Sequence, residues 1–272
     1  MTMYKALTFA GSDTSGGAGL QADLKTFQER DVYGMVALTT IVTMDPDNNW
    51  AHGVFPVELS TIREQLKTSL KGIGVDAMKT GMLATEEIIK LAVETIDTYD
   101  LKNVIVDPVM VCKGADEAVF PEVNNAIRDL LVPKALVVTP NLFEAAQLAG
   151  MAPITSIEEM KEAAQRIQSL GVKYVLVKGG SKLQGTDKAV DVLYDGNEFE
   201  ILEGEKIEGG FTHGAGCTIS ACITAEIAKG NDVKEAIYTA KKFITAAIKH
   251  SFPLNQYVGP TRHSALRVFG EE

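Results

Sequence analysis

A glycine-rich segment that runs directly into helix-forming sequence carries the clearest chemical signal in the chain. It reads Thr212-His213-Gly214-Ala215-Gly216-Cys217-Thr218. Successive backbone amides at a helix start, together with the helix dipole, bind anions, and the charge on a transferring phosphoryl group could lie there. The same field favours a thiolate, so we expect a lowered pKa at Cys217 and a role as base for a substrate hydroxyl. The alternative is a small buried residue at the start of a core helix.

Acidic side chains follow two of the predicted strands. Asp107 opens Asp107-Pro108-Val109-Met110, and Glu144 closes Thr139-Pro140-Asn141-Leu142-Phe143-Glu144. Mg²⁺ prefers a few carboxylates, water and substrate phosphates to a complete protein cage, so this pair indicates a magnesium site. Each residue alone also fits a structural role, Asp107 as a turn former before proline and Glu144 as a carboxylate at a helix start.

Two other glycine-containing segments also follow predicted strands. The segment 11–19 (GSDTSGGAG) permits tight turns and a close approach of the backbone to a ligand, but it also fits a plain strand-to-helix turn. The segment 177–182 (VKGGSK) combines glycines with lysines and suits nucleotide phosphates or ribose. The chain contains neither a GxxxxGK[S/T] phosphate loop nor a clean GxGxxG dinucleotide motif.

The hydrophobic pattern predicts a scaffold that brings these strand ends together. Strands are expected at residues 5–10, 36–43, 77–80, 104–106, 136–138 and 174–177. Helices are expected at 17–30, 59–70, 85–99, 121–131, 141–149 and 156–169, the last with a capping box of Ser156 and Glu159. The final third adds a hairpin of 189–194 with 199–202 and helices at about 217–229 and 233–249. This alternation predicts a largely parallel sheet covered on both faces, with ligands beyond the carboxyl ends of the strands.

Composition excludes several classes of protein. The net charge of −10 over 272 residues argues against a general nucleic-acid binder, although a local basic pocket for a small phosphate ligand stays open. Cys112, Cys217 and Cys222 cannot all pair and form no CxxC, so a disulfide scaffold and a structural zinc site are not expected. His52, His250 and His263 share no metal-ligand spacing and are interpreted as structural or surface groups. We expect one reduced, cytoplasmic domain spanning residues 1–272, with no signal peptide, membrane span or nucleic-acid partner.

Taken together, the motifs resemble those of the ribokinase superfamily, in the branch of the hydroxymethylpyrimidine (phosphate) kinases and bacterial pyridoxal kinases. The resemblance covers residues 7–267. The matching segments are 10–27 (AGSDTSGGAGLQADLKTF), 79–83 (KTGML), 107–110 (DPVM), 139–145 (TPNLFEA), 178–180 (KGG) and 213–218 (HGAGCT). This resemblance implies a ribokinase-like three-layer αβα sandwich with a mostly parallel central sheet, Mg²⁺ as cofactor and ATP as co-substrate. Homodimers are common among such relatives.

The resemblance also implies roles for individual residues. Glu144 and Asp107 would hold the metal, and the family's Asn-x-x-Glu motif falls on Asn141 and Glu144. The implied ATP site consists of Asn141, Lys178, Gly179, Gly180, Ser181, Lys182, Asp191, Gly216 and Lys241. The implied catalytic groups are Gly214, Ala215, Gly216, Cys217 and Cys112, and the implied substrate contacts are Gly11, Asp13, Gly19, Met44, Met82, Val109 and Cys112. Many ribokinase relatives carry Asp as the base where this branch carries a cysteine.

Two positions bear on which ring is phosphorylated. The pyrimidine kinases have a Val-x-Gln-Asn pattern where this chain reads Val42-Thr43-Met44-Asp45, so Met44 replaces a polar partner of the ring. Cys112, in the lid segment after DPVM, resembles a subgroup with two cysteines that phosphorylates pyridoxal. A thiol adds reversibly to an aldehyde, and we expect Cys112 to form a hemithioacetal with pyridoxal when the lid closes and excludes water. The alternative is that Cys112 is an incidental lid residue.

The expected function is therefore ATP-dependent 5′-phosphorylation of pyridoxal, pyridoxine or pyridoxamine in pyridoxal phosphate salvage. The alternative on the same fold is a hydroxymethylpyrimidine (phosphate) kinase of thiamin biosynthesis, and activity on both rings is also open. A non-catalytic B6-vitamer binding protein is an alternative from another class. The joint presence of Asp107, Glu144, Lys178 and Cys217 argues against it. A dinucleotide-dependent oxidoreductase would need a different glycine spacing after the first strand.

Overall fold

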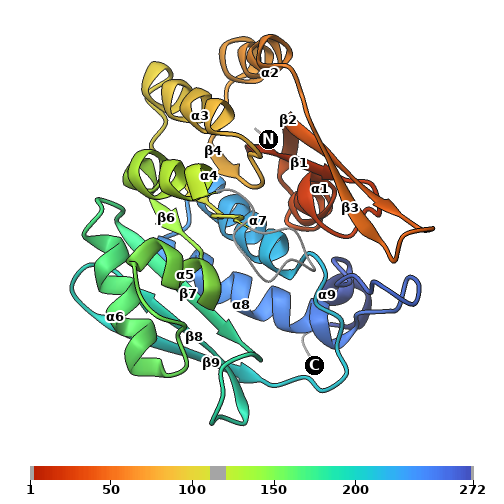
Figure 1. The fold of residues 1–272 in the computed structure, drawn as a ribbon, viewed down its shortest axis with the longest axis vertical. Helices are drawn as coiled ribbons and strands as arrows, with labels where there is room; N and C mark the ends of the chain where they lie inside the picture. Colours follow the sequence, from red (N-terminus) through yellow and green to blue (C-terminus); the bar gives the residue numbers. More distant parts are fainter. Residues whose placement is uncertain (1–2, 111–120, 271–272) are drawn as a thin grey trace.

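A nine-stranded sheet forms the centre of the molecule in a computed structural model of the chain, which describes residues 3–110 and 121–270 (Figure 1). The strands follow the order β3-β2-β1-β4-β5-β6-β7-β8-β9. Pairing is parallel from β2 through β7 in this order, whereas β3, β8 and β9 are antiparallel to their neighbours. The strands are β1 (Lys5–Asp13), β2 (Tyr33–Asp45), β3 (Ala51–Pro56), β4 (Ala77–Thr80), β5 (Val104–Val106), β6 (Val137–Val138), β7 (Tyr174–Gly180), β8 (Lys188–Tyr194) and β9 (Phe199–Glu205).

Helices cover both faces of this sheet. One face packs against α2 (Leu59–Leu66), α3 (Glu86–Thr98), α4 (Pro121–Ala126), α5 (Leu142–Ala149) and α6 (Ile157–Gln168). The other face packs against α1 (Gly19–Glu29), α7 (Ala215–Ala228) and α8 (Val233–Lys249), with α9 (Ala265–Phe269) against α8.

The central strands are buried on both sides, as their unbroken apolar sequence requires. Successive side chains of a strand point to opposite faces, so Val104 and Val106 join the core under one helical layer while Ile105 joins the other. Strand β7 repeats the pattern, with Val175 on the first side and Leu176 on the second. The predicted αβα sandwich with a mostly parallel sheet is confirmed.

Several predicted boundaries were wrong. The helix expected at 59–70 is α2 followed by a π-helical turn, η1 (Lys67–Ile73), and the helix expected at 121–131 is α4 followed by η2 (Ile127–Leu131) and a 3₁₀ turn, η3 (Val132–Lys134). Strand β2 is longer than expected, and β3 and α9 were not predicted. Most of β3 is exposed at the edge of the sheet, so burial imposes no apolar alternation from which a strand could be recognised. The capping box of Ser156 and Glu159 is confirmed.

Helix α7 packs on the central strands of the sheet. It contacts β1, β4 and β5, so its first turn lies near the carboxyl ends of these strands.

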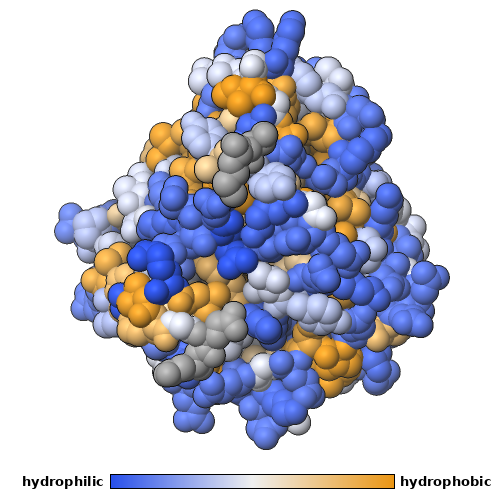
Figure 2. Space-filling view, turned by 180° about the vertical axis from the view of Figure 1, so that it is seen from behind, coloured by the Kyte–Doolittle hydropathy of each residue, from blue (hydrophilic) through white to orange (hydrophobic). Residues whose placement is uncertain are grey.

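Figure 2 shows the side of the molecule opposite to that of Figure 1, where apolar side chains form separate groups among polar ones. In the part of the chain that the structure describes, no helix is both long and apolar enough to cross a membrane.

Candidate active site

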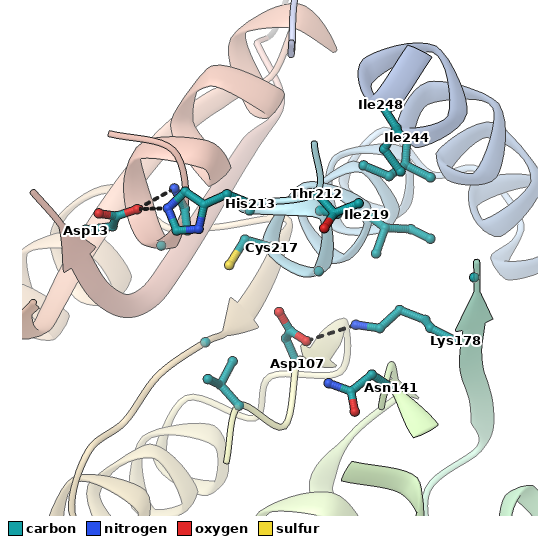
Figure 3. A pocket seen from close by; sticks show the side chains of 18 of the residues that line it. Asp13, Asp107, Asn141, Lys178, Thr212, His213, Cys217, Ile219, Ile244 and Ile248 are labelled. Carbon is teal, nitrogen blue, oxygen red and sulfur yellow. Dashed lines mark hydrogen bonds and ion pairs between the residues drawn. The ribbon is translucent and has the colours of Figure 1, made fainter. Parts of the chain in front are cut away.

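A cavity of about 500 Å³ opens at the carboxyl ends of the parallel strands, beside the first turn of α7 (Figure 3). The structure brings to this cavity every predicted site residue that it describes. These are Gly11, Asp13, Gly19, Met44, Met82, Asp107, Val109, Asn141, Glu144, Lys178, Gly179, Gly180, Ser181, Lys182, Asp191, Gly214, Ala215, Gly216, Cys217 and Lys241. Cys112 lies outside the described residues. His52, interpreted from sequence as structural or surface, also lines the cavity.

The cap of α7 places backbone amides at the cavity. Gly214 has a φ of +80°, and a Cβ at this position would clash with the carbonyl oxygen of Gly17, so only glycine fits where the two glycine-rich segments meet. The first amides of a helix have no acceptor within it. The Ala215 N–H is used outside the helix, because it donates to the carbonyl of Thr212 at 3.1 Å. We therefore expect the amides of Gly216 and Cys217, rather than that of Ala215, to face an anion.

A partly buried lysine reinforces this positive helix end. The Nζ of Lys178 donates to a carboxylate oxygen of Asp107 at 3.3 Å and lies 3.5 Å from the point where a Cβ of Gly216 would be. Burial would lower the pKa of Lys178, but the charges of Asp107 and Glu144 outweigh it and raise the pKa. Lys178 therefore stays charged beside the start of α7 (Figure 3). The ammonium and the positive end of the helix dipole both favour a phosphate group there.

Two carboxylates face the same lysine. Glu144 forms a capping box with Asn141, with N–H to side-chain oxygen distances of 2.8 and 3.0 Å, so the helix-start role and the cavity position coincide. Burial raises the pKa of Glu144 to about 7, Lys178 opposes the rise and Asp107 adds to it. A divalent cation would relieve this repulsion, so the pair fits Mg²⁺. Among the described residues no group of three or more His, Cys, Asp or Glu could hold a metal.

The prediction of a lowered pKa at Cys217 was wrong. Burial raises the pKa of this thiol to about 12. The charge of Lys79 lowers it and a hydrogen bond from the Gly19 backbone lowers it further, but Asp23 and Asp107 raise it. The field of the helix start does not compensate for lost hydration when two carboxylates face the same sulfur.

Asp13 joins the two glycine-rich segments. Its carboxylate accepts hydrogen bonds from the Ser15 N–H (2.8 Å), the Ser15 hydroxyl (3.0 Å) and the Ala18 N–H (2.8 Å), and it pairs with Nε2 of His213 at 2.7 Å. The side chain predicted to contact substrate is thus held by four protein donors. Its substrate contact stays a prediction, whereas its role as a clamp between the segments is visible in Figure 3.

The opposite end of the cavity combines a second ion pair with apolar side chains. Lys241 Nζ donates to Asp191 at 2.6 Å, and the Gly180 N–H donates to the other oxygen of the same carboxylate at 3.0 Å. Close by, the structure adds three residues that the sequence did not indicate: Ile219, Ile244 and Ile248 (Figure 3). Ile219 lies on α7, which is buried nearly all round, and Ile244 and Ile248 lie on the amphipathic α8. In both helices an isoleucine has the same sequence signature whether it faces a core or a ligand, so no sequence signal separates them.

A fully buried ion pair at the cavity wall was also missed. Lys79 Nζ lies 2.7 Å from Asp23 Oδ1, both side chains are 0% exposed, and the Thr8 hydroxyl donates to Asp23 Oδ2 at 2.6 Å. Both charged residues lie in segments that resemble the kinase motifs, but 56 positions separate them and nothing in the sequence pairs them.

Comparison with known proteins gives a consistent set of relatives. The family model for phosphomethylpyrimidine kinase matches residues 13–262. A pyridoxine kinase of Bacillus subtilis is 65% identical over 98% of this chain and 98% of that protein. The crystal structure of an ADP complex of Bacillus subtilis pyridoxal kinase has a TM-score of 0.95 at 64% identity, covering 98% of this chain and 100% of that one. Staphylococcus aureus pyridoxal kinase in complex with AMP-PCP and pyridoxal has a TM-score of 0.92 at 49% identity, covering 99% and 96%.

Proposed function

Because this chain belongs to the phosphomethylpyrimidine kinase family, we propose that it is an ATP-dependent kinase that phosphorylates the 5′-hydroxymethyl group of pyridoxal and related B6 vitamers. One observation carries the proposal. At a single cavity, the first turn of α7 meets the Lys178 ammonium and the carboxylates of Asp107 and Glu144. A polyphosphate and its counter-ion need this combination. The relatives named for pyridoxine and pyridoxal support the choice of ring.

The two ends of the cavity suit the two substrates. We place the base of ATP at the apolar end formed by Ile219, Ile244 and Ile248, with its phosphates running toward Lys178 and Gly216. The predicted ATP residues Asn141, Gly179, Gly180, Ser181, Lys182, Asp191 and Lys241 line the same cavity, which supports this placement. The ring of the vitamin would lie at the other end, near Met44, Met82 and Val109.

Asp107 and Glu144 would hold Mg²⁺, which when bound neutralises charge on the transferring phosphate. In the transfer, the bond between the substrate oxygen and phosphorus forms as the bond to the ADP oxygen breaks, and the hydroxyl proton must leave. Lys178 and the amides of Gly216 and Cys217 would stabilise the negative charge on the phosphoryl oxygens. Cys217 is the proposed proton acceptor. It can accept a proton only as thiolate, which its raised pKa makes scarce at neutral pH.

Selectivity for pyridoxal would rest on Cys112 and Met44. We propose that the Cys112 sulfur adds to the aldehyde carbon of pyridoxal while the aldehyde oxygen takes up a proton, giving a reversible hemithioacetal. Met44 offers no hydrogen bond to a polar ring substituent, which disfavours an aminopyrimidine.

The deciding experiment compares ATP-dependent turnover of pyridoxal, pyridoxine and hydroxymethylpyrimidine in the wild type and in Cys112→Ala. We expect pyridoxal to be preferred, and we expect Cys112→Ala to impair pyridoxal far more than pyridoxine, which has no aldehyde. Cys222→Ala is the matched control, because Cys222 is buried in α7 away from the cavity lining.

The other outcomes identify the alternatives. If the pyrimidine is preferred and Cys112→Ala leaves turnover unchanged, the protein is a hydroxymethylpyrimidine (phosphate) kinase. Tight binding of a B6 vitamer without turnover of any ring would mean a binding protein. Equal losses on pyridoxal and pyridoxine would exclude the hemithioacetal.

We further propose that the chain acts as a single domain in the cytoplasm, where ATP is available and thiols stay reduced, and that it forms a homodimer. Light scattering of the purified protein measures the assembly directly, and a monomer mass would contradict the dimer.

A further inference from the structure

The loop before α7 is braced by a C-terminal segment that the proposed reaction does not use. The Thr261 N–H donates to the carbonyl of His213 at 3.2 Å, and the His213 N–H donates to the carbonyl of Gly259 at 3.2 Å. These bonds form a short parallel bridge between His213 and Pro260. The C-terminal segment is therefore fixed against the backbone that leads into the proposed phosphate site.

Thr218 connects this brace to the cap of the helix. Its hydroxyl donates to the Gly214 carbonyl at 2.8 Å, and its N–H donates to the same carbonyl at 2.9 Å. The peptide unit is planar, so holding the Gly214 carbonyl also fixes the direction of the Ala215 N–H. The same cap sets the orientation of the next two amides, those of Gly216 and Cys217, which we expect to face the proposed phosphate.

His263 holds Thr218 from behind. Its Nε2 lies 3.0 Å from the Thr218 hydroxyl oxygen, and the Thr261 hydroxyl lies 3.4 Å from that oxygen. Because the Thr218 hydroxyl gives its single proton to Gly214, its oxygen accepts from His263, which then carries its proton on Nε2. His263 is 7% exposed, and burial lowers its pKa to about 4. The ring is thus neutral at pH 7 and carries one N–H, which the bond to Thr218 places on Nε2.

We propose that His263 and Thr218 are positioning residues for phosphoryl transfer, which orient the first turn of α7 through the hydrogen-bonded series His263–Thr218–Gly214. This inference rests on the proposed kinase function. Among the described residues that line the cavity neither side chain appears, so both act through the helix backbone rather than on substrate. Stabilisation of transition-state charge depends on donors fixed in advance, and small misplacements lower turnover strongly.

The same helix provides a matched control. Thr224 is 0% exposed like Thr218, and its hydroxyl donates to the Ser220 carbonyl at 2.8 Å, which is the same bond to the residue four positions earlier. Thr218→Val and Thr224→Val therefore remove the same hydroxyl-to-carbonyl bond from the same helix. We expect a larger fall of the thermal midpoint for Thr218→Val, because the buried His263 N–H also loses its acceptor, so kcat is compared well below both midpoints. We expect Thr218→Val to lower kcat by roughly 10- to 100-fold with little change in the KM for the vitamin, and Thr224→Val to change kcat by less than about 3-fold.

Conservative variants separate positioning from packing. Thr218→Ser keeps the hydroxyl and should recover most of kcat, and His263→Gln, which keeps an N–H donor, should be more active than His263→Phe, which does not. Equal kcat values for Thr218→Val and Thr224→Val would overturn the inference, and normal kcat in His263→Phe would remove His263 from it. If the wild type phosphorylates none of the rings, both the proposed function and this inference are refuted. If the wild type is active but Thr218→Val and Thr224→Val have equal kcat values, only the inference is refuted.

Discussion

At the scale of single residues, Cys217 shows how burial competes with a favourable field. A helix start and the Lys79 ammonium both stabilise a thiolate, yet the loss of hydration raises the pKa to about 12. In a loose phosphoryl-transfer transition state little charge develops on the attacking oxygen, so its proton can leave late. Under those conditions the position of the acceptor matters as much as its basicity in the ligand-free protein.

This balance gives a prediction about pH. We expect Cys217→Ala to lower kcat by roughly 10²- to 10⁴-fold, as for loss of a positioned base, while ADP binding measured by calorimetry stays close to wild type. Because the thiolate fraction rises about tenfold per pH unit below a pKa of about 12, wild-type kcat should rise with pH from 7 to 10 if the thiolate is the base. Cys217→Asp supplies the carboxylate of many ribokinase relatives and should flatten this rise.

Two outcomes would contradict a role of the Cys217 thiolate as base. Near-normal turnover in Cys217→Ala would remove the residue from proton transfer. A wild-type profile that is already flat from pH 7 to 10 would show that the reacting form is not the thiolate.

At the scale of elements, the pair of Lys79 on β4 and Asp23 on α1 fixes a helix to the centre of the sheet. Burial lowers the pKa of a lysine on its own, but the carboxylates of Asp23 and Asp107 raise that of Lys79, so the ammonium stays charged in the interior. A buried charge without a partner is much more costly than the complete pair.

We therefore expect Lys79→Met to lower the free energy of unfolding by about 3–5 kcal/mol, because Asp23 is left buried and unpaired. The double variant Lys79→Met with Asp23→Leu should lose less free energy of unfolding than Lys79→Met alone, since no uncompensated charge remains. Urea unfolding followed by circular dichroism measures both. The exposed pair of Arg63 and Glu94 between α2 and α3 is the control, and Arg63→Ala should cost at most about 1 kcal/mol. If Lys79→Met loses no more free energy of unfolding than the double variant, an unpaired buried Asp23 is not the cause of the loss.

The elements also show what the sequence could predict. Parallel strands buried on both faces have unbroken apolar sequence and short motifs at their carboxyl ends, so the positions of Asp107, Glu144 and Lys178 followed from order along the chain. Contacts between distant segments carry no local pattern, which is why the pairing of Asp23 with Lys79 and the brace of Thr218 by His263 were not foreseen. The sign of the Cys217 pKa shift depends on the same kind of information, namely how much protein surrounds the sulfur.

At the scale of the whole molecule, Asp13 and His213 join segments that are 200 positions apart. Asp13 ends β1 near the start of the chain, and His213 precedes α7 in its last third. Burial alone would raise the pKa of Asp13, but hydrogen bonds from His213 and Ser15 outweigh it and lower the pKa from 3.8 to about 2. The ionised carboxylate is thus stabilised in the folded protein relative to the unfolded chain.

This shift predicts how global stability responds to acid. A carboxylate whose pKa is lowered on folding contributes stability above its ordinary pKa, and the contribution is lost as pH falls through the folded value. The shift from 3.8 to about 2 corresponds to about 2 kcal/mol. We expect Asp13→Asn to be less stable than the wild type at pH 6, with a difference that shrinks by roughly half near pH 3, because the unfolded wild-type chain, with its higher Asp13 pKa, takes up the proton before the folded protein does. Urea unfolding at each pH measures the two curves, and their convergence in acid is its own control, because a loss due to altered packing would be the same at every pH. Parallel curves from pH 6 to pH 3 would show that the clamp between the two segments does not depend on the Asp13 charge.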